Sequence, residues 1–324
     1  MDWSPLVAFL RTHDRPLLMT HIRPDGDGLG AQLALADALK AQGMQPRVCI
    51  ASVLPPRYRF LDPDRKVIED FRKPLRPLDD CNAIVVMDTG TWNQLGDFAE
   101  YLKASPLPRV VIDHHRTQDD LGGQAFVDID AEATGRLSFE IIEALGAPLS
   151  PAAANHLFLA LAHDTGWFRH SNTTPATFAL AERLTTAGAN PTALYEKLFE
   201  TSSLARYRLV GKALERLQTR AGGRIAFTEI LLADYPATGA VPGDTEDMID
   251  YPRSIEGVEV ALLFIEQADG GTKISFRSRA ADVSRLAEAL GGGGHKLAAG
   301  ARVKESLASV RDRVLVETQK ALDS

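Results

Sequence analysis

The sequence of 324 residues is poor in cysteine and contains no long hydrophobic run. Its two cysteines, Cys49 and Cys81, are too few for the disulfide framework of a small secreted protein, and they favour a reducing cytoplasm. No stretch of about 18 consecutive apolar residues occurs, so we expect no transmembrane helix. The first residues, Met1 to Pro5, lack the basic segment and the apolar run of a signal peptide. These absences predict a cytoplasmic protein without a membrane partner.

Basic residues are not in excess either. The chain has 36 lysines and arginines against 43 aspartates and glutamates, for a formal net charge of −7. A protein that coats a long polyanion needs many cations along its path, so long duplex nucleic acid is not an expected partner. The hydrophobic content of 45% is enough for a full core, and the length suggests two domains.

Predicted strands alternate with predicted helices in the first half of the chain. Apolar runs typical of strands occupy residues 16–22, 47–50, 83–88 and 110–112, and patterns typical of helices occupy residues 29–41, 133–145 and 152–162. Residues 51–78 are interpreted as a proline-rich connection. The alternation predicts an α/β fold with a doubly wound, mostly parallel sheet.

Acidic residues and histidines stand where these elements end. The run Val110-Val111-Ile112, for example, leads directly into an acid and two histidines. Because ligands bind beyond the carboxyl ends of strands in such sheets, we expect these side chains to lie close together. The full set is His21, Asp25, Asp27, Asp88, Asp113, His114, His115 and Asp164.

Several carboxylates close together repel one another, and some must bind protons unless cations lie between them. A ligand set of imidazole and carboxylate suits manganese, iron or zinc. Any one of these residues could instead be a helix cap or a turn former, but that reading explains the whole set poorly. A calcium loop starting at Asp25 is disfavoured because Leu29 and Ala36 stand at two of its ligand positions. A dinucleotide fingerprint is disfavoured because no acid follows about 20 residues on, and because Asp25 and Asp27 would repel a pyrophosphate.

The second half of the chain follows a linker near residues 189–205 and is rich in predicted strands. After a helix at 204–219, strands are expected at 224–232, 258–267 and 272–279. Arg277 and Arg279 share a face of the last strand. A helix at 282–290 then ends in four glycines followed by His295, a run that is either a flexible loop or a backbone cradle for an anion.

Four segments, His21 to Asp27, Val86 to Asp88, Asp113 to His115 and Asp164 to Gly166, resemble the four motifs of the DHH phosphoesterase superfamily in order and spacing. The glycine run with its histidine resembles the signature of the DHHA1 substrate-binding domain. The resemblance covers nearly the whole chain. It implies a DHH catalytic metal-binding domain at 1–188, a helical linker at 189–205 and a smaller α/β DHHA1 domain at 206–324.

The resemblance implies a site for two divalent ions, with manganese as the expected metal. His21 and Asp25 would hold one ion, Asp27, His114 and Asp164 would hold the other, and Asp88 would bridge them. Asp113 would orient the histidine that follows it, and His115 would face the reacting phosphate. The expected substrate-binding residues are Arg277, Ser278, Arg279, Gly293, Gly294 and His295, with Ser171, Asn172 and Thr174 as further candidates.

The implied activity is hydrolysis of short oligonucleotides to mononucleotides and of 3′-phosphoadenosine 5′-phosphate (pAp) to AMP, by a hydroxide that bridges two ions. The C-terminal signature differs from that of manganese pyrophosphatases, and the chain has no room for the additional modules of RecJ-type exonucleases. A phosphodiesterase for cyclic-di-AMP or pApA is the alternative, and a nucleotide sensor without turnover is a third reading. The sequence leaves open whether the chain forms a homodimer.

Overall fold

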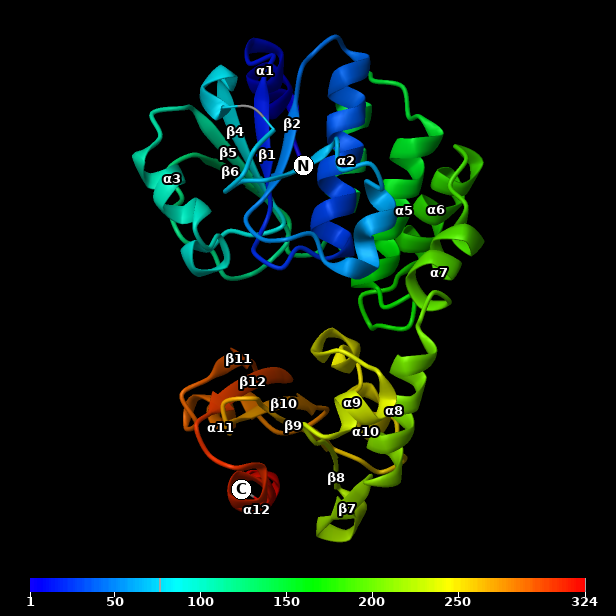
Figure 1. Ribbon diagram of the computed structural model, residues 1–324. Coiled ribbons are helices and arrows are strands. Elements are labelled where there is room, and N and C mark those ends of the chain that lie inside the picture. The colour runs from blue at the N-terminus through cyan, green and yellow to red at the C-terminus, as the bar shows by residue number, and fades with distance from the viewer. Residues whose placement is uncertain (76, 324) are drawn as a thin grey trace. The chain divides into compact units, whose positions relative to one another are not determined.

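The computed structural model describes residues 1–75 and 77–323, apart from the side chain of His295, and it divides into two compact units (Figure 1). The first unit is Met1–Thr201 and the second is Ser202–Ser324. The division thus falls inside the predicted linker, residues 189–205. In the part of the chain that is described, no helix is long and apolar enough to span a bilayer.

The first unit is built on a six-stranded sheet in the order β3-β2-β1-β4-β5-β6, and all its strand pairs are parallel. The strands are β1 (Pro16–Met19), β2 (Arg47–Ile50), β3 (Ile68–Asp70), β4 (Ala83–Met87), β5 (Arg109–Asp113) and β6 (Gln124–Val127). The order reverses between β1 and β4, and at such a switch point the strand ends leave room for a ligand. The predicted doubly wound parallel sheet is confirmed.

Helices cover both faces of this sheet because side chains alternate along each buried strand. On β1, Leu18 packs with α1 (Ser4–Thr12) and α2 (Gly26–Ala41), whereas Leu17 and Met19 pack with α3 (Phe98–Ala104) on the opposite face. Helix α2 also packs along α4 (Thr134–Ala144) and α5 (Pro151–Asp164). Beyond α5 lie α6 (Pro175–Thr186) and α7 (Pro191–Phe199).

Cys49 and Cys81 are buried and free, in agreement with the absence of a disulfide framework.

The second unit is a smaller α/β fold, as predicted. Its sheet has the order β11-β12-β10-β9-β8-β7, in which only the β8–β9 pair is parallel among the described pairings. The strands are β7 (Gln218–Arg220), β8 (Ile225–Ile230), β9 (Val260–Glu266), β10 (Thr272–Ser278), β11 (Gly293–His295) and β12 (Ala298–Val303). The helices are α8 (Leu204–Glu215), α9 (Asp234–Thr238), α10 (Asp250–Arg253), α11 (Val283–Glu288) and α12 (Leu307–Asp323).

The helix expected at residues 204–219 is too long. Helix α8 ends at Glu215, and Gln218–Arg220 leave the helical path to pair with β8 as strand β7. One face of the sheet packs against α11 and α12, and the other packs against α8.

Candidate metal centre

The sequence-predicted cluster forms at the carboxyl ends of the three adjacent strands β1, β4 and β5. His21 follows β1, Asp88 follows β4, and Asp113 is the last residue of β5. The amino end of α2 and the carboxyl end of α5 complete the cluster with Asp25, Asp27 and Asp164. Four overlapping groups could hold a metal ion, because the ligand atoms within each group lie within 4.8 Å of one another. Their members are His21, Asp25, Asp27, Asp88, His114, His115, His163 and Asp164.

Asp25 is the N-cap of α2. Its Oδ1 accepts hydrogen bonds from the backbone N–H groups of Asp27, at 3.0 Å, and Gly28, at 3.2 Å. Its second oxygen, Oδ2, lies 3.4 Å from Nε2 of His163. Its Oδ1 also lies 3.8 Å from Nε2 of His21, so the cap fixes the orientation of a carboxylate that has a histidine beside each oxygen.

Asp27 is held by the amino end of α4. Its Oδ2 accepts a bond from the N–H of Thr134, at 2.7 Å, and its Oδ1 accepts one from the N–H of Gly135, at 2.8 Å. A helix amino end favours negative charge, so this fully buried carboxylate keeps a fixed position at the bottom of the cluster.

Asp88 is also buried, and its backbone has a φ of 62°, in the left-handed region that non-glycine residues adopt at a cost of about 1 kcal/mol. The Thr134 hydroxyl donates a hydrogen bond to its Oδ1 at 3.0 Å. Backbone strain of this kind persists where the surroundings enforce it, often at a functional site.

Backbone carbonyls orient two of the histidines. Nδ1 of His21 lies 2.9 Å from the carbonyl oxygen of Ile22, and Nδ1 of His114 lies 3.1 Å from that of Ala131. When Nδ1–H donates to a carbonyl, the lone pair of Nε2 is left for a ligand, which is the arrangement of most metal-binding histidines.

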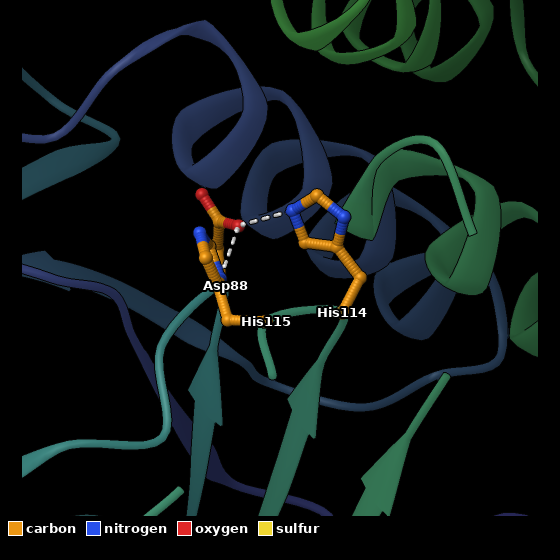
Figure 2. A group of neighbouring side chains, drawn as sticks. All are labelled: Asp88, His114 and His115. Atoms are coloured by element: carbon orange, nitrogen blue, oxygen red, sulfur yellow. Dashed lines mark ion pairs between the residues drawn. The ribbon is translucent and has the colours of Figure 1, made fainter. Parts of the chain in front are cut away.

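Nε2 of His114 is the best indication that the cluster fits a cation. It is buried and has no hydrogen-bond partner among the described residues. Carboxylate oxygens of Asp164, Asp88 and Asp27 surround it at 3.2, 3.6 and 3.7 Å. Figure 2 shows the rings of His114 and His115 turned toward the carboxylate of Asp88. Imidazole nitrogen among carboxylates is a donor set that suits divalent transition metals.

Asp113 supports His115 rather than the ring of His114. Its Oδ1 lies 2.7 Å from Nδ1 of His115 and accepts bonds from the backbone N–H groups of both histidines, and Gln118 donates to its Oδ2 at 2.6 Å. The expectation that Asp113 orients the histidine after it therefore needs correction, because the carbonyl of Ala131 holds that ring.

Without a cation, the charges of the cluster oppose one another. Burial raises the pKa of Asp27 well above its ordinary value, and the charges of Asp88 and Asp164 raise it further. Burial acts to lower the pKa of His21, but Asp25 and Asp88 raise it well above its ordinary value. At His114, burial again acts to lower the pKa, but the charges of Asp164 and Asp88 raise it to about 9. Bound protons thus offset the negative charge of the carboxylates, and a divalent cation would displace these protons on binding.

His163 was not among the predicted ligands. It precedes Asp164 on the last turn of α5, and its ring reaches Asp25. The sequence contained one usable signal, since His163 and Asp164 stand together at the helix end that leads into the cluster.

The predicted substrate-binding residues of the second unit lie on β10, after it, and on β11. Arg277 is half-buried on β10, Ser278 is buried beside it, and Arg279 donates to the carbonyl oxygen of Arg253 at 3.1 Å. Gly293 and Gly294 pair with β12, so the glycine run is partly a strand. A Cβ at Gly294 would lie 2.5 Å from Cα of Ala299, which requires glycine there. The side chain of His295 lies outside the described structure.

Two of the three further candidates after α5 have local structural roles. Asn172 donates to the carbonyl oxygens of Asp164 and Glu132, both at 3.2 Å, and Thr174 is the N-cap of α6. Ser171 is exposed. Asn172 therefore steadies the backbone of a predicted ligand.

Comparisons with known proteins agree with the two-unit fold. The DHH family, N-terminal domain, matches residues 16–161, and the DHHA1 domain matches residues 210–322. The bifunctional oligoribonuclease and PAP phosphatase NrnA of Thermus thermophilus is 31% identical, over 98% of this chain and 94% of its own length. The protein of the same name from Bacillus subtilis is 26% identical, over 93% of each chain.

A solved structure shares the fold along the whole chain. The crystal structure of an exopolyphosphatase-related protein from Bacteroides fragilis matches with a TM-score of 0.89 at 21% identity, over 99% of this chain and 97% of that one. This similarity shows the fold, and the two matched domains and the relative that is 31% identical show the family. The chain belongs to the DHH phosphoesterases that carry a DHHA1 domain, in the branch of the NrnA proteins.

Proposed function

We propose that this chain is a metal-dependent phosphoesterase that hydrolyses short oligonucleotides to mononucleotides and pAp to AMP. The observation that carries the proposal is the unpartnered Nε2 of His114 among three aspartates, in a chain whose curated relatives are named for these two activities. We place the activity in the cytoplasm, in keeping with two free cysteines.

The proposed cofactor is a pair of divalent ions, with Mn²⁺ as the expected metal. His21 and Asp25 would hold one ion, Asp27, His114 and Asp164 would hold the other, and Asp88 would contact both. When bound, such ions lower the pKa of a water molecule and stabilise charge on the leaving oxygen. Buried Asp27 and Asp88, fixed by the amino end of α4 and by Thr134, keep the ligand oxygens in place before any ion arrives.

His115 is proposed to contact the reacting phosphate. Its side chain is 43% exposed, whereas that of His114 is 11% exposed, so His115 is the more accessible of the two rings. The hydrogen bond from Nδ1 to Asp113 fixes the orientation of the ring. A donor held in this way can stabilise negative charge on phosphoryl oxygens without reorganising.

The second unit is proposed to bind a terminal phosphate or nucleotide through Arg277, Ser278, Arg279, Gly293, Gly294 and His295. Arg277 carries the charge that a phosphate needs, and the edge strand β11 offers backbone N–H groups at positions without side chains. These residues belong to a different unit from all the proposed metal ligands.

The test is an incubation of the full chain with Mn²⁺ and each of a diribonucleotide, pAp, pApA, cyclic-di-AMP and pyrophosphate. We expect mononucleotide from the diribonucleotide and AMP plus phosphate from pAp, and no product after chelation of the metal. Turnover of cyclic-di-AMP alone would move the assignment to a cyclic-dinucleotide phosphodiesterase. Binding of nucleotide without any product would make the chain a sensor.

A further inference from the structure

The ring of His163 is directed into the metal centre. It sits on the last turn of α5, and its Nε2 lies 3.4 Å from Oδ2 of Asp25. The other oxygen of Asp25 is occupied by two backbone N–H groups of α2. His163 therefore faces the oxygen of Asp25 that accepts no hydrogen bond from α2, whereas His21 lies 3.8 Å from the other oxygen. Asp25, His163 and Asp164 form one of the four groups able to hold an ion.

The length of this contact is typical of two ligands that share an ion. Two donor atoms bound to one ion at about 2.1 Å lie about 3.0 to 3.4 Å apart. The contact of His163 with Asp25 has this length, as do those of His21 with Asp88 at 3.4 Å and of His114 with Asp164 at 3.2 Å. A direct hydrogen bond in the same cluster is shorter, since His115 lies 2.7 Å from Asp113.

Nδ1 of His163 has an oxygen atom as its neighbour, as Nδ1 of His21 and Nδ1 of His114 also do. Nδ1 of His163 lies 3.4 Å from the hydroxyl of Tyr58, a side chain that is 2% exposed. The hydroxyl of Tyr58 can accept a hydrogen bond from Nδ1–H, and in that tautomer Nε2 of His163 is left for a metal. The carbonyls at His21 and His114 only accept, so they impose the same tautomer there.

The first turn of α2 leaves space for the ring. A Cβ at Gly26 would lie 2.8 Å from Cβ and 2.9 Å from Cγ of His163. The absence of a side chain at residue 26 is therefore what allows His163 to approach Asp25.

We propose that Nε2 of His163 is a ligand of the ion that His21 and Asp25 hold, so that this ion has two imidazoles. The proposal rests on the metal centre of the proposed function and adds a residue to it. Because imidazole suits zinc, iron and nickel better than manganese or magnesium, His163 should shift the preference of this ion site toward the later transition metals.

The test counts imidazoles by X-ray absorption at the metal edge, on full-length protein that has been stripped of metal and reloaded with Co²⁺. The wild type should show three imidazoles over its two ions, and His163→Ala should show one fewer. The same substitution should weaken Co²⁺ binding at one of the two sites by on the order of 100-fold, and should weaken Mn²⁺ binding less. His13→Ala, which removes a histidine after α1 that belongs to none of the ligand groups, should change neither quantity.

A second variant separates a ligand from a positioning residue. Glutamine at position 163 can still donate a hydrogen bond to Asp25 but replaces the imidazole. Full recovery of Co²⁺ affinity in His163→Gln, or an imidazole count that is the same in wild type and His163→Ala, would overturn the proposal while leaving the metal centre intact. A wild-type protein that binds no metal would instead overturn the proposed function.

Discussion

The two carboxylate oxygens of Asp88 face two different histidines: Oδ2 lies 3.4 Å from Nε2 of His21, and Oδ1 lies 3.6 Å from Nε2 of His114. This geometry supports the proposed bridging role of Asp88, because each of its oxygens faces a histidine that is proposed to hold a different ion.

Asp88→Asn should therefore weaken both ion sites at once. We expect a loss of activity larger than the roughly 10- to 100-fold that follows when a residue that only supports a ligand is changed. Metal analysis of the purified variant should find less than the wild-type content of both ions. Asp79→Asn, a change at an exposed aspartate, is the control and should behave as wild type. Two tightly bound ions and normal turnover in Asp88→Asn would contradict the bridging role.

Gly28 controls how closely α2 approaches Asp88. A Cβ at this position would lie 2.4 Å from Oγ1 of Thr20 and 3.1 Å from Oδ2 of Asp88. Gly28→Ala should lower the free energy of unfolding by about 1 to 3 kcal/mol and weaken metal binding, because the carboxylate must move.

Gly211→Ala is the matched control for Gly28→Ala. Gly211 is also a helix residue, on α8, and a Cβ there would meet nothing within 4 Å. This change should stabilise the protein by up to about 1 kcal/mol. Urea unfolding and metal titration of both variants give the comparison, and equal effects at the two positions would show that the approach to Asp88 is not tight.

The ends of β1, β4 and β5 could be predicted because apolar runs stop abruptly at histidine or aspartate in the sequence. Strands β3 and β6 could not, since β3 has three residues and the first two residues of β6 are exposed. Only pairing with neighbouring strands makes such short segments extended, and that pairing is not visible in their own composition.

Contacts between distant segments were beyond prediction from the sequence pattern. The bonds from the backbone of Thr134 and Gly135 to Asp27 join residues more than 100 positions apart. The orientation of His163 toward Asp25 depends on where α5 ends and on how it packs against α2, and neither could be derived from spacing.

Arg277 should affect substrate capture and not metal content. It lies in the second unit, whereas all the proposed metal ligands lie in the first. Arg277→Ala should raise KM for a diribonucleotide while two ions remain bound. Lys273→Ala is the control, because Lys273 is exposed and stands on the same face of β10. Loss of metal from Arg277→Ala, or an unchanged kcat/KM, would remove Arg277 from the substrate-binding residues.

His156, on α5, should make the metal-free protein sensitive to acid. Its Nδ1 is buried without a hydrogen-bond partner among the described residues, and burial lowers its pKa to about 4, against the charge of Asp37. The unfolded chain binds this proton below about pH 6.5, whereas the folded chain resists it until about pH 4. Its contribution to stability is therefore fully present above about pH 6.5 and falls as the pH drops, by about 2 kcal/mol at pH 5.

Urea unfolding of wild type and His156→Leu between about pH 7 and pH 5 measures this effect. All other groups titrate in both proteins, so the difference between the two free energies of unfolding isolates His156. That difference should shift in favour of the variant by about 2 kcal/mol as the pH falls. A difference that stays constant with pH would show that His156 is protonated alike in the folded and unfolded states.

The central claim, that this is a hydrolase of short oligonucleotides, is tested most directly by its dependence on substrate length. Each phosphate that a protein cation neutralises adds affinity and salt dependence, and this chain has a net charge of −7. The measurement is kcat/KM with Mn²⁺ for RNA of two, three, five, ten and twenty nucleotides at two salt concentrations. We predict that kcat/KM falls as the strand grows and that its salt dependence stays shallow. Processive digestion of the twenty-nucleotide strand, as fast as that of the dinucleotide and strongly inhibited by salt, would contradict the account.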